Sequence, residues 1–318
     1  MTRPIALTPC EPGGLDPEAV AASIEAWVTS PAFTELAGHF GGEVPDGPLD
    51  AVLDWAAEFS AVWDFRAGVK ERFDNARVDY RPDLDERLRS LIGILGLDGA
   101  DRPAQDSYDH VVVLGGGIRV ALGRTDFTAR LLAGGLRVRT LAGLGSLRFR
   151  DDREHREGRR LGLDPFETEA DMMTIGMRRF VGLSEPISVR EGDGWWHRVW
   201  AGQHPGVEEI HVLAAPSTQP PRRANTADTL IGWAEHVGTP TADERVLLVT
   251  NAPYVRHQHC DAVRLLGSRY GCGIETVGFD DLATTAWGRR LHTTELLQEV
   301  RSSVLATRNL HNAVVASR

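Results

Sequence analysis

The length and composition of the chain are those of an ordinary globular protein. It has 318 residues, of which 42% are hydrophobic and 25% charged, which excludes a disordered, collagenous or membrane-embedded chain. Its 35 basic and 45 acidic residues give a net charge of −10, which argues against a nucleic-acid partner or a membrane surface. We therefore expect contact with neither nucleic acid nor membrane, and the oligomeric state stays open.

Lysine and cysteine usage narrows the possible chemistry. Lys70 is the only lysine, and no glycine-rich loop precedes it, which argues against pyridoxal-phosphate and Walker-type NTPase chemistry. Cys10, Cys260 and Cys272 are too scattered for a disulfide framework. The N-terminus lacks a signal-peptide pattern, and no stretch approaches about 18 uninterrupted apolar residues. We expect a cytoplasmic protein with reduced thiols.

Helical patterns occupy the N-terminal third of the sequence. Asp16 is a predicted N-cap with Pro17 at the first helical position. Longer patterns run from about 48 to 73 and from about 83 to 95. We expect their aromatic residues to form a helical core rather than a pocket, because apolar helix stripes mostly pack against their own protein. Residues 1–105 are therefore predicted to be a helical N-terminal region.

Beyond residue 105, apolar strands alternate with helical patterns. The predicted strands are His110–Leu114, Leu136–Leu141, Ile210–Ala215, Arg245–Thr250 and Ile274–Gly278. Such alternation is typical of a parallel sheet covered by helices on both faces. A β-hairpin is predicted near 187–200, and an amphipathic helix at 293–316. For 106–318 the sequence thus predicts a doubly wound, mainly parallel, Rossmann-like α/β domain with about five strands and an inserted hairpin.

Small and polar residues follow the predicted strands, at the edge where an open parallel sheet binds its ligands. Glycines after the first strand let the backbone approach an anion, and the next helix directs N–H groups toward it; a tight strand-to-helix turn is the structural alternative. The candidate ligand-binding residues are Gly115, Gly116, Gly117, Arg119, Arg124, Gly143, Gly145, Ser146, Asn225, Thr226, Thr250, Asn251, Tyr254 and Arg256.

Some of these motifs have two interpretations. Asn225 or Thr226 can cap a helix as readily as contact a ligand. Arg256 and His257 follow the fourth strand, where they can bind a phosphate or carboxylate and shuttle a proton.

Other site types are disfavoured by the spacing of their motifs. Position 120, where a dinucleotide fingerprint needs its third glycine, is valine, so an NAD-type site is disfavoured. His257 and His259 are not at a standard zinc spacing, so no metal site is predicted. The sequence contains no Gly-x-Ser-x-Gly elbow, the motif that would indicate a serine hydrolase. The charged run 151–160 is expected to be a solvated loop or a lid over a ligand.

The order of these motifs resembles the YdcF/SanA/ElyC family, a broad bacterial group with a Rossmann-like domain of poorly defined function. The resemblance covers about residues 108–280. Thr168-Glu169-Ala170 is similar to the family's Ser-Glu-Ala, Asn225-Thr226 to its Asn-Thr, and Leu248-Val249-Thr250 to its strand before the last loop. The resemblance implies a nucleotide-like or phosphorylated small-molecule ligand, with S-adenosylmethionine as one candidate. It implies no particular reaction.

Three residues are candidates for catalysis. The family motif falls on Glu169, at a helix start where the dipole favours a carboxylate able to accept a proton; a plain helix-start acid is the alternative. Asp228 stands where the family has Glu and could act with Glu169. Tyr254 stands at the family's histidine, and His257 at its arginine. We expect an enzyme acting on an anionic or nucleotide-like small molecule. The alternative is a non-catalytic binding or regulatory protein for the same ligand class.

Overall fold

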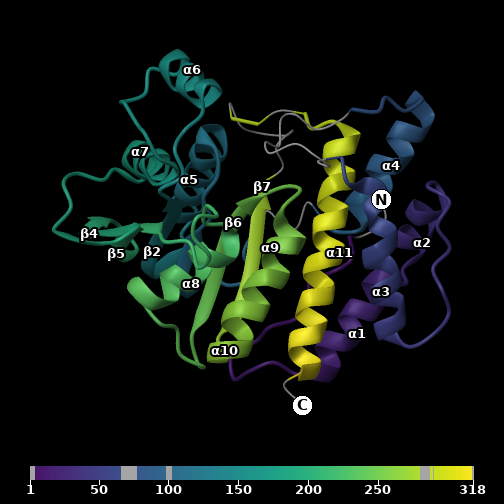
Figure 1. The fold of residues 1–318 in the computed structure, drawn as a ribbon. Helices are drawn as coiled ribbons and strands as arrows, with labels where there is room; N and C mark the ends of the chain where they lie inside the picture. Colours follow the sequence, from purple (N-terminus) through teal and green to yellow (C-terminus); the bar gives the residue numbers. More distant parts are fainter. Residues whose placement is uncertain (1–3, 66–76, 98–101, 280–286, 289, 317–318) are drawn as a thin grey trace.

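A seven-stranded sheet forms the centre of the computed structural model, which describes residues 4–65, 77–97, 102–279, 287–288 and 290–316 (Figure 1). The strand order is β3-β4-β5-β2-β1-β6-β7. The strands are β1 (Ser107–Val113), β2 (Arg137–Ser146), β3 (Ser188–Gly192), β4 (Trp195–His204), β5 (Val207–Ala215), β6 (Arg245–Asn251) and β7 (Gly273–Phe279). Neighbours among β5, β2, β1, β6 and β7 run parallel, whereas β4 runs antiparallel to β3 and to β5.

The expected mixed α/β class, mainly parallel sheet and helical N-terminal region are confirmed, but the expected number of about five strands is wrong. The five apolar runs are the parallel strands, and the hairpin adds β3 and β4 to the same sheet. Trp200 of β4 pairs with Ile210 of β5 and is fully buried, so the hairpin extends the sheet and contributes to its core.

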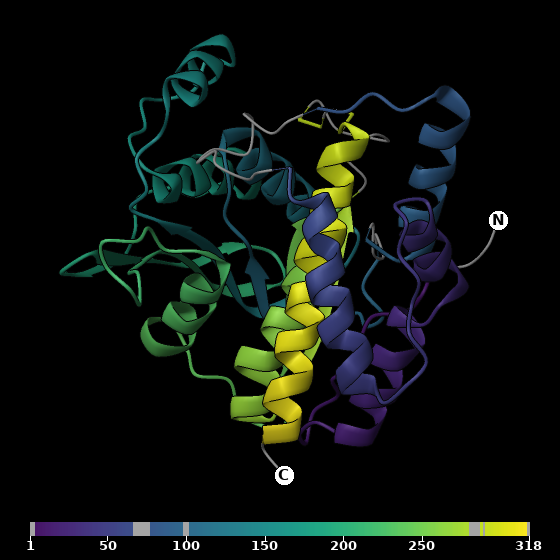
Figure 2. The ribbon, with the colours of Figure 1, turned by 45° about the vertical axis from the view of Figure 1, so that its right-hand side comes forward.

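Helices cover both faces of the sheet (Figures 1 and 2). The helices that follow β1 are α5 (Ile118–Ala133), α6 (Asp152–Arg160), α7 (Glu169–Val181), α8 (Thr226–His236), α9 (Val255–Ala262), the π-helical turn η3 (Val263–Gly267), α10 (Ser268–Tyr270) and α11 (Thr293–Ala316). One hydrophobic cluster joins the sheet to α5 and α7, and another joins its other face to α8, α9 and α11. Helix α6 projects from the body of the molecule, at the upper left of Figure 1.

The N-terminal helices pack against α11 (Figure 2). They are α1 (Pro17–Val28), α2 (Pro31–Gly38), α3 (Leu49–Phe59), the 3-10 turn η1 (Ser60–Trp63) and α4 (Pro82–Ile94). Asp16 accepts hydrogen bonds from the N–H groups of Glu18 and Ala19, as an N-cap should. Trp27 and Trp63 are fully buried. For these two residues the prediction of a helical core rather than a pocket is confirmed. No helix in the described ranges is long and apolar enough to span a bilayer.

Candidate functional site

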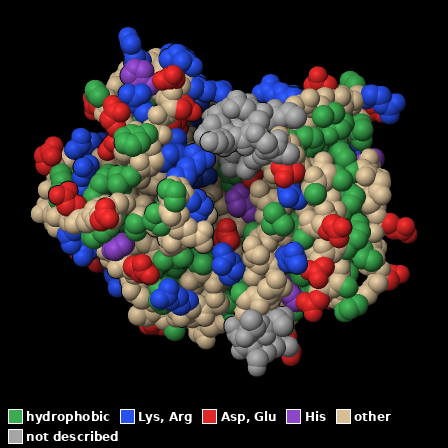
Figure 3. All heavy atoms as spheres, in the orientation of Figure 1, with side chains coloured by type: hydrophobic (Ala, Val, Ile, Leu, Met, Phe, Trp, Pro, Cys, Tyr) green, Lys and Arg blue, Asp and Glu red, His purple; other side chains and the backbone are tan. Residues whose placement is uncertain are grey.

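The order of the parallel strands reverses between β1 and β6, because β2 and β5 lie on one side of β1 and β6 and β7 on the other. In open parallel sheets, a crevice forms at such a reversal, outside the carboxyl ends of the strands, and ligands bind there. Figure 3 shows a hollow in the middle of one face, between the sheet part and the helical part, with acidic, basic and histidine side chains on its walls.

Arg124 connects the two sides of this reversal. It belongs to α5 and, although it carries a positive charge, it is only 2% exposed. Its Nε donates to Asn251 Oδ1 at 2.9 Å, and its Nη1 donates to the carbonyl of Leu114 at 2.9 Å and to that of Gly115. The guanidinium therefore holds the turn after β1 against the end of β6.

The glycine turn after β1 allows two carboxylates to approach the backbone. A Cβ on Gly115 would lie 2.6 Å from the carbonyl oxygen of Leu144 and 2.9 Å from Glu169 Oε1. A Cβ on Gly117 would lie 2.9 Å from Glu154 Oε1. Gly117 is the N-cap of α5 and makes no side-chain capping bond. The glycines are thus required for close approach, but the groups that approach in this structure are acids.

Gly116 has a different neighbour, since a Cβ there would lie 2.7 Å from Val120 Cγ1. Gly143 and Gly145 of β2 serve helix packing. A Cβ on Gly143 would lie 2.7 Å from Met173 Cγ, and one on Gly145 would lie 2.7 Å from Ala170 Cα. These two glycines let α7 pack closely against β2.

That close packing places Glu169 at the end of β2. Glu169 is the first residue of α7, whose N-cap is Thr168 in a capping box with Asp171. Ser146 Oγ donates to Glu169 Oε2 at 2.6 Å, and Arg148 Nε lies 4.0 Å from the same oxygen. The structure therefore brings the predicted residues Gly115, Ser146 and Glu169 together.

Helix α6 lies over the glycine turn. Glu154 is 7% exposed and accepts two hydrogen bonds from the Arg148 guanidinium, at 3.0 and 2.8 Å. Glu157 forms an ion pair of 2.6 Å with Arg119. A loop was expected over this charged run, but Asp151 and Glu154 form a capping box that starts a helix. Their three-residue spacing is the signal in the sequence that could have predicted it.

The β6 side of the crevice carries Tyr254 and His257. Their rings meet edge to face with centroids 6.0 Å apart, and the Arg124 guanidinium carbon lies 5.9 Å from the Tyr254 ring centroid. Nδ1 of His257 is 3.6 Å from Oε2 of Glu299, a residue of α11 that is 3% exposed. Glu299 was not predicted from the sequence, because no local pattern distinguishes it from other helix acids.

Arg256 points away from this group. It is 2% exposed, and it donates to the carbonyls of Leu95 at 2.9 Å and of Ile5 and Ala6 at 2.8 Å. Its guanidinium lies over the Trp27 ring at 5.1 Å, and burial lowers the pKa of Arg256 to about 10. The contacts of this arginine join α9 to the N-terminal part of the chain.

Asn225 and Asp228 form a helix cap. Asn225 Oδ1 accepts from the N–H of Asp228 at 3.0 Å, and Asp228 Oδ2 accepts from the N–H of Asn225 at 2.8 Å. Asp228 also accepts from Thr218 and Arg222. Burial would raise the pKa of Asp228, but these hydrogen bonds lower it overall. Thus the structural alternative, capping, accounts for this pair.

The remaining predicted residues bond locally. Thr226 is the first residue of α8, and its carbonyl accepts from Thr229 Oγ1 at 2.9 Å. Thr250 Oγ1 donates to Gln258 Oε1, and Asn251 Nδ2 donates to the carbonyl of Ala252 at 2.9 Å.

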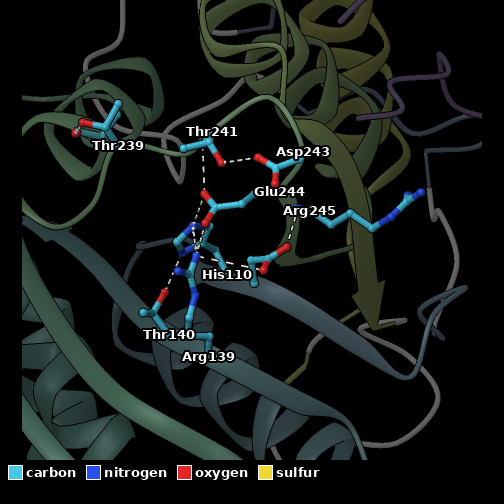
Figure 4. A network of polar contacts seen from close by, with 10 residues as sticks. His110, Arg139, Thr140, Thr239, Thr241, Asp243, Glu244 and Arg245 are labelled. Carbon is cyan, nitrogen blue, oxygen red and sulfur yellow. Dashed lines mark hydrogen bonds and ion pairs between the residues drawn. The ribbon is translucent and has the colours of Figure 1, made fainter. Parts of the chain in front are cut away.

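A second polar network lies at the opposite, amino-terminal edge of the sheet (Figure 4). His110 Nδ1 is 2.6 Å from Thr140 Oγ1, and its Nε2 is 3.1 Å from Glu244 Oε2. Arg139 donates to the other oxygen of that carboxylate, Oε1. Burial is the main cause that lowers the pKa of His110. Burial would raise the pKa of Glu244, but bonds from Thr241, His110 and Arg139 hold it at about 2. These groups neutralise one another and tie β1, β2 and β6 together. Within the described part of the chain, no group of three or more His, Cys, Asp or Glu residues is placed to hold a metal ion.

Comparison with known proteins places the chain among mycobacterial relatives. Residues 11–96 match the family model described as the Rv3785 N-terminal domain. The chain is 31% identical over 345 residues to "Uncharacterized protein Rv3785" of Mycobacterium tuberculosis (strain ATCC 25618 / H37Rv), covering 98% of this chain and 94% of that protein. "Uncharacterized protein Mb3814" of Mycobacterium bovis (strain ATCC BAA-935 / AF2122/97) has the same identity and coverage. No solved structure matches the chain.

Proposed function

We propose that this chain, which belongs to the family of the mycobacterial protein Rv3785, is an enzyme for a nucleotide-like or phosphorylated small molecule. The ligand would bind in the crevice between the carboxyl ends of β1 and β6. The order β5-β2-β1-β6-β7 supports a Rossmann-like interpretation, since that fold binds its ligands where the strand order reverses. The free cysteines Cys10, Cys260 and Cys272 are compatible with a cytoplasmic setting.

The observation that carries the proposal is the approach of Glu169 to Gly115. The glycine turn, the end of β2 and the start of α7 converge there, and Glu169 Oε1 lies within 2.9 Å of the position of a Gly115 Cβ. A carboxylate at this point can accept a hydrogen bond from a ligand hydroxyl or take its proton. Glu169 is also the residue on which the resemblance to the YdcF/SanA/ElyC family falls, which supports a nucleotide-like ligand such as S-adenosylmethionine.

The anionic part of the ligand would use the N-terminus of α5. The first N–H groups of a helix lack intrahelical partners and attract negative charge. The carboxylate of Glu154 lies beside Gly117, at this same helix end. A phosphate bound there therefore takes the place of that carboxylate, and α6 moves as the ligand enters.

A non-catalytic binding protein is the second candidate. Tyr254 stands where the resembled family has histidine, and Asp228 is occupied by its helix cap and by Arg222. Two of the positions expected to move protons are thus changed or engaged, whereas the glycine turn and Glu169 remain.

Identification of the ligand tests the proposal. The purified protein is denatured, and small molecules released from it are identified by mass spectrometry. The compound found is then titrated calorimetrically into the wild type, Glu169→Gln and Glu167→Gln. Glu167 is the control because it is an exposed carboxylate two residues away that pairs with Arg150. We expect weakened binding or lost turnover in Glu169→Gln alone. Unchanged binding and turnover in that variant would remove Glu169 from the site, and recovery of the ligand unaltered would favour the binding protein.

A further inference from the structure

We infer that Glu299 is a positioning residue that holds His257 with its proton on Nδ1, so that Nε2 is the proton-accepting nitrogen of the proposed site. The inference rests on the proposed function for its catalytic meaning. The tautomer itself is a property of the ligand-free protein, so it can be tested separately.

The geometry brings Glu299 and His257 together from two helices that lie side by side in both ribbon views (Figures 1 and 2). His257 is in the first turn of α9, directly after the end of β6, and its side chain is 15% exposed. Glu299 is within α11, and its side chain is 4% exposed. The distance of 3.6 Å joins Oε2 of the carboxylate to Nδ1 of the imidazole.

Because Glu299 is buried, its contact with His257 favours one of the two imidazole tautomers. A carboxylate removed from water is stabilised by an N–H donor or a positive charge. A neutral imidazole protonated at Nδ1 presents such a donor, whereas one protonated at Nε2 would face the carboxylate with a lone pair. Glu299 therefore favours the first tautomer, and when Nε2 takes up a proton the same carboxylate stabilises the imidazolium.

The surroundings of His257 restrict the ring further. The Tyr254 ring packs edgewise on it, and Tyr254 is 7% exposed. Tyr254 also lies below the Arg124 guanidinium, which holds the glycine turn. A series of contacts thus runs from Glu299 through His257, Tyr254 and Arg124 to the glycine turn beside Glu169.

Nuclear magnetic resonance of the full chain tests the inference without any ligand. Long-range proton–nitrogen correlation of the ¹⁵N-labelled protein, above the pH at which imidazoles titrate, shows which ring nitrogen of His257 carries the proton. His257→Gln assigns the signal. We expect the Nδ1-protonated form in the wild type, its loss in Glu299→Met, which removes both acceptor oxygens, and its retention in Glu299→Asp, which keeps the carboxylate. Glu235→Gln, which removes an exposed carboxylate from α8, should change nothing.

The Nε2-protonated form in the wild type, or an unchanged tautomer in Glu299→Met, would overturn the inference. If Glu299→Met does not fold, a tautomer in Glu299→Asp that is protonated at Nε2 overturns it equally. Either result leaves the proposed function standing, because ligand binding is measured independently. Conversely, an Nδ1-protonated His257 in a protein that binds no small anion would contradict the proposed function alone.

Discussion

Arg124 and Asn251 are hydrogen-bonded across the point at which the strand order reverses, with Nε and Oδ1 2.9 Å apart. The positive charge of a buried arginine is thus directed at the protein itself, at the end of one strand and the turn after another. The turn after β1 and the end of β6 are therefore joined by bonds within the chain before any ligand arrives.

Replacement of Arg124 is therefore expected to lower stability as well as binding. Hydrogen bonds from a charged donor contribute about 1.5–3 kcal/mol each, so Arg124→Gln should lower the free energy of unfolding by about 3 kcal/mol. Urea denaturation measures the change. Arg156→Gln, at an exposed position of α6, should leave stability within about 0.5 kcal/mol of the wild type. Normal stability with weakened binding in Arg124→Gln would show instead that its charge serves the ligand.

Gly115→Ala should disrupt the site by crowding it. The added methyl group would lie 2.6 Å from the Leu144 carbonyl, a backbone atom that cannot turn away. Overpacking of this kind costs about 1–3 kcal/mol, and displacement of Glu169 should weaken ligand binding. Gly238→Ala is the control, since nothing lies within 4 Å of its Cβ position. Thermal unfolding and calorimetric titration of the two variants check the prediction, and equal behaviour would contradict it.

Glu169→Gln should reduce the rate far more than the stability. The amide oxygen of Gln can still accept from Ser146 Oγ, so the fold keeps its bond, whereas an amide cannot take a proton. General acid–base groups contribute about 10²–10⁴-fold, and turnover of the identified substrate should fall by that factor. Asp228→Asn is the comparison, because Asp228 belongs to a helix cap. If Asp228→Asn lost the activity and Glu169→Gln kept it, the assignment would be reversed.

Stability should fall on acidification, in part because of His259. Burial lowers the pKa of His259 to about 4, and its ring nitrogens lie 2.9 Å from Thr276 Oγ1 and 2.7 Å from the carbonyl of Thr8. In the unfolded chain an imidazole titrates near pH 6.5. Between these two pKa values the unfolded state binds a proton that the folded state does not bind. The free energy of unfolding therefore decreases as the pH falls from about 6.5 toward 4.

The size of this effect can be measured by urea denaturation at pH 7 and pH 5. His259 should account for about 2 kcal/mol of the difference. His259→Gln should show a drop smaller by that amount, and His155→Gln, on the exposed side of α6, should show the wild-type drop. An identical pH dependence in His259→Gln would mean that this histidine is protonated in the folded protein.

The features that could be predicted from the sequence are those that depend on residues close to one another in the chain. The Asp16 N-cap and the five apolar strands could be predicted because capping and strand burial depend on residues within a few positions. The pairing of the hairpin with β5 could not be predicted, because the pattern of hydrophobic residues in a strand does not specify the strand beside which it will lie. Arg256 shows the same limit: its acceptors are residues 5, 6 and 95, and only the tertiary fold brings them to it.

The N-terminal helices and α11 share one hydrophobic cluster, and this has a consequence for synthesis on the ribosome. Trp27 and Phe33 are buried in the same hydrophobic cluster as Leu297 and Val304 of α11. The ribosome synthesises the first two residues more than 250 residues earlier than the last two. Until α11 leaves the exit tunnel, the apolar faces of the early helices lack part of their partner, which is the situation in which nascent chains aggregate or bind chaperones. We therefore expect ribosome-bound chains that stop before residue 293 to be protease-sensitive in their N-terminal third, and chains that expose α11 to become resistant.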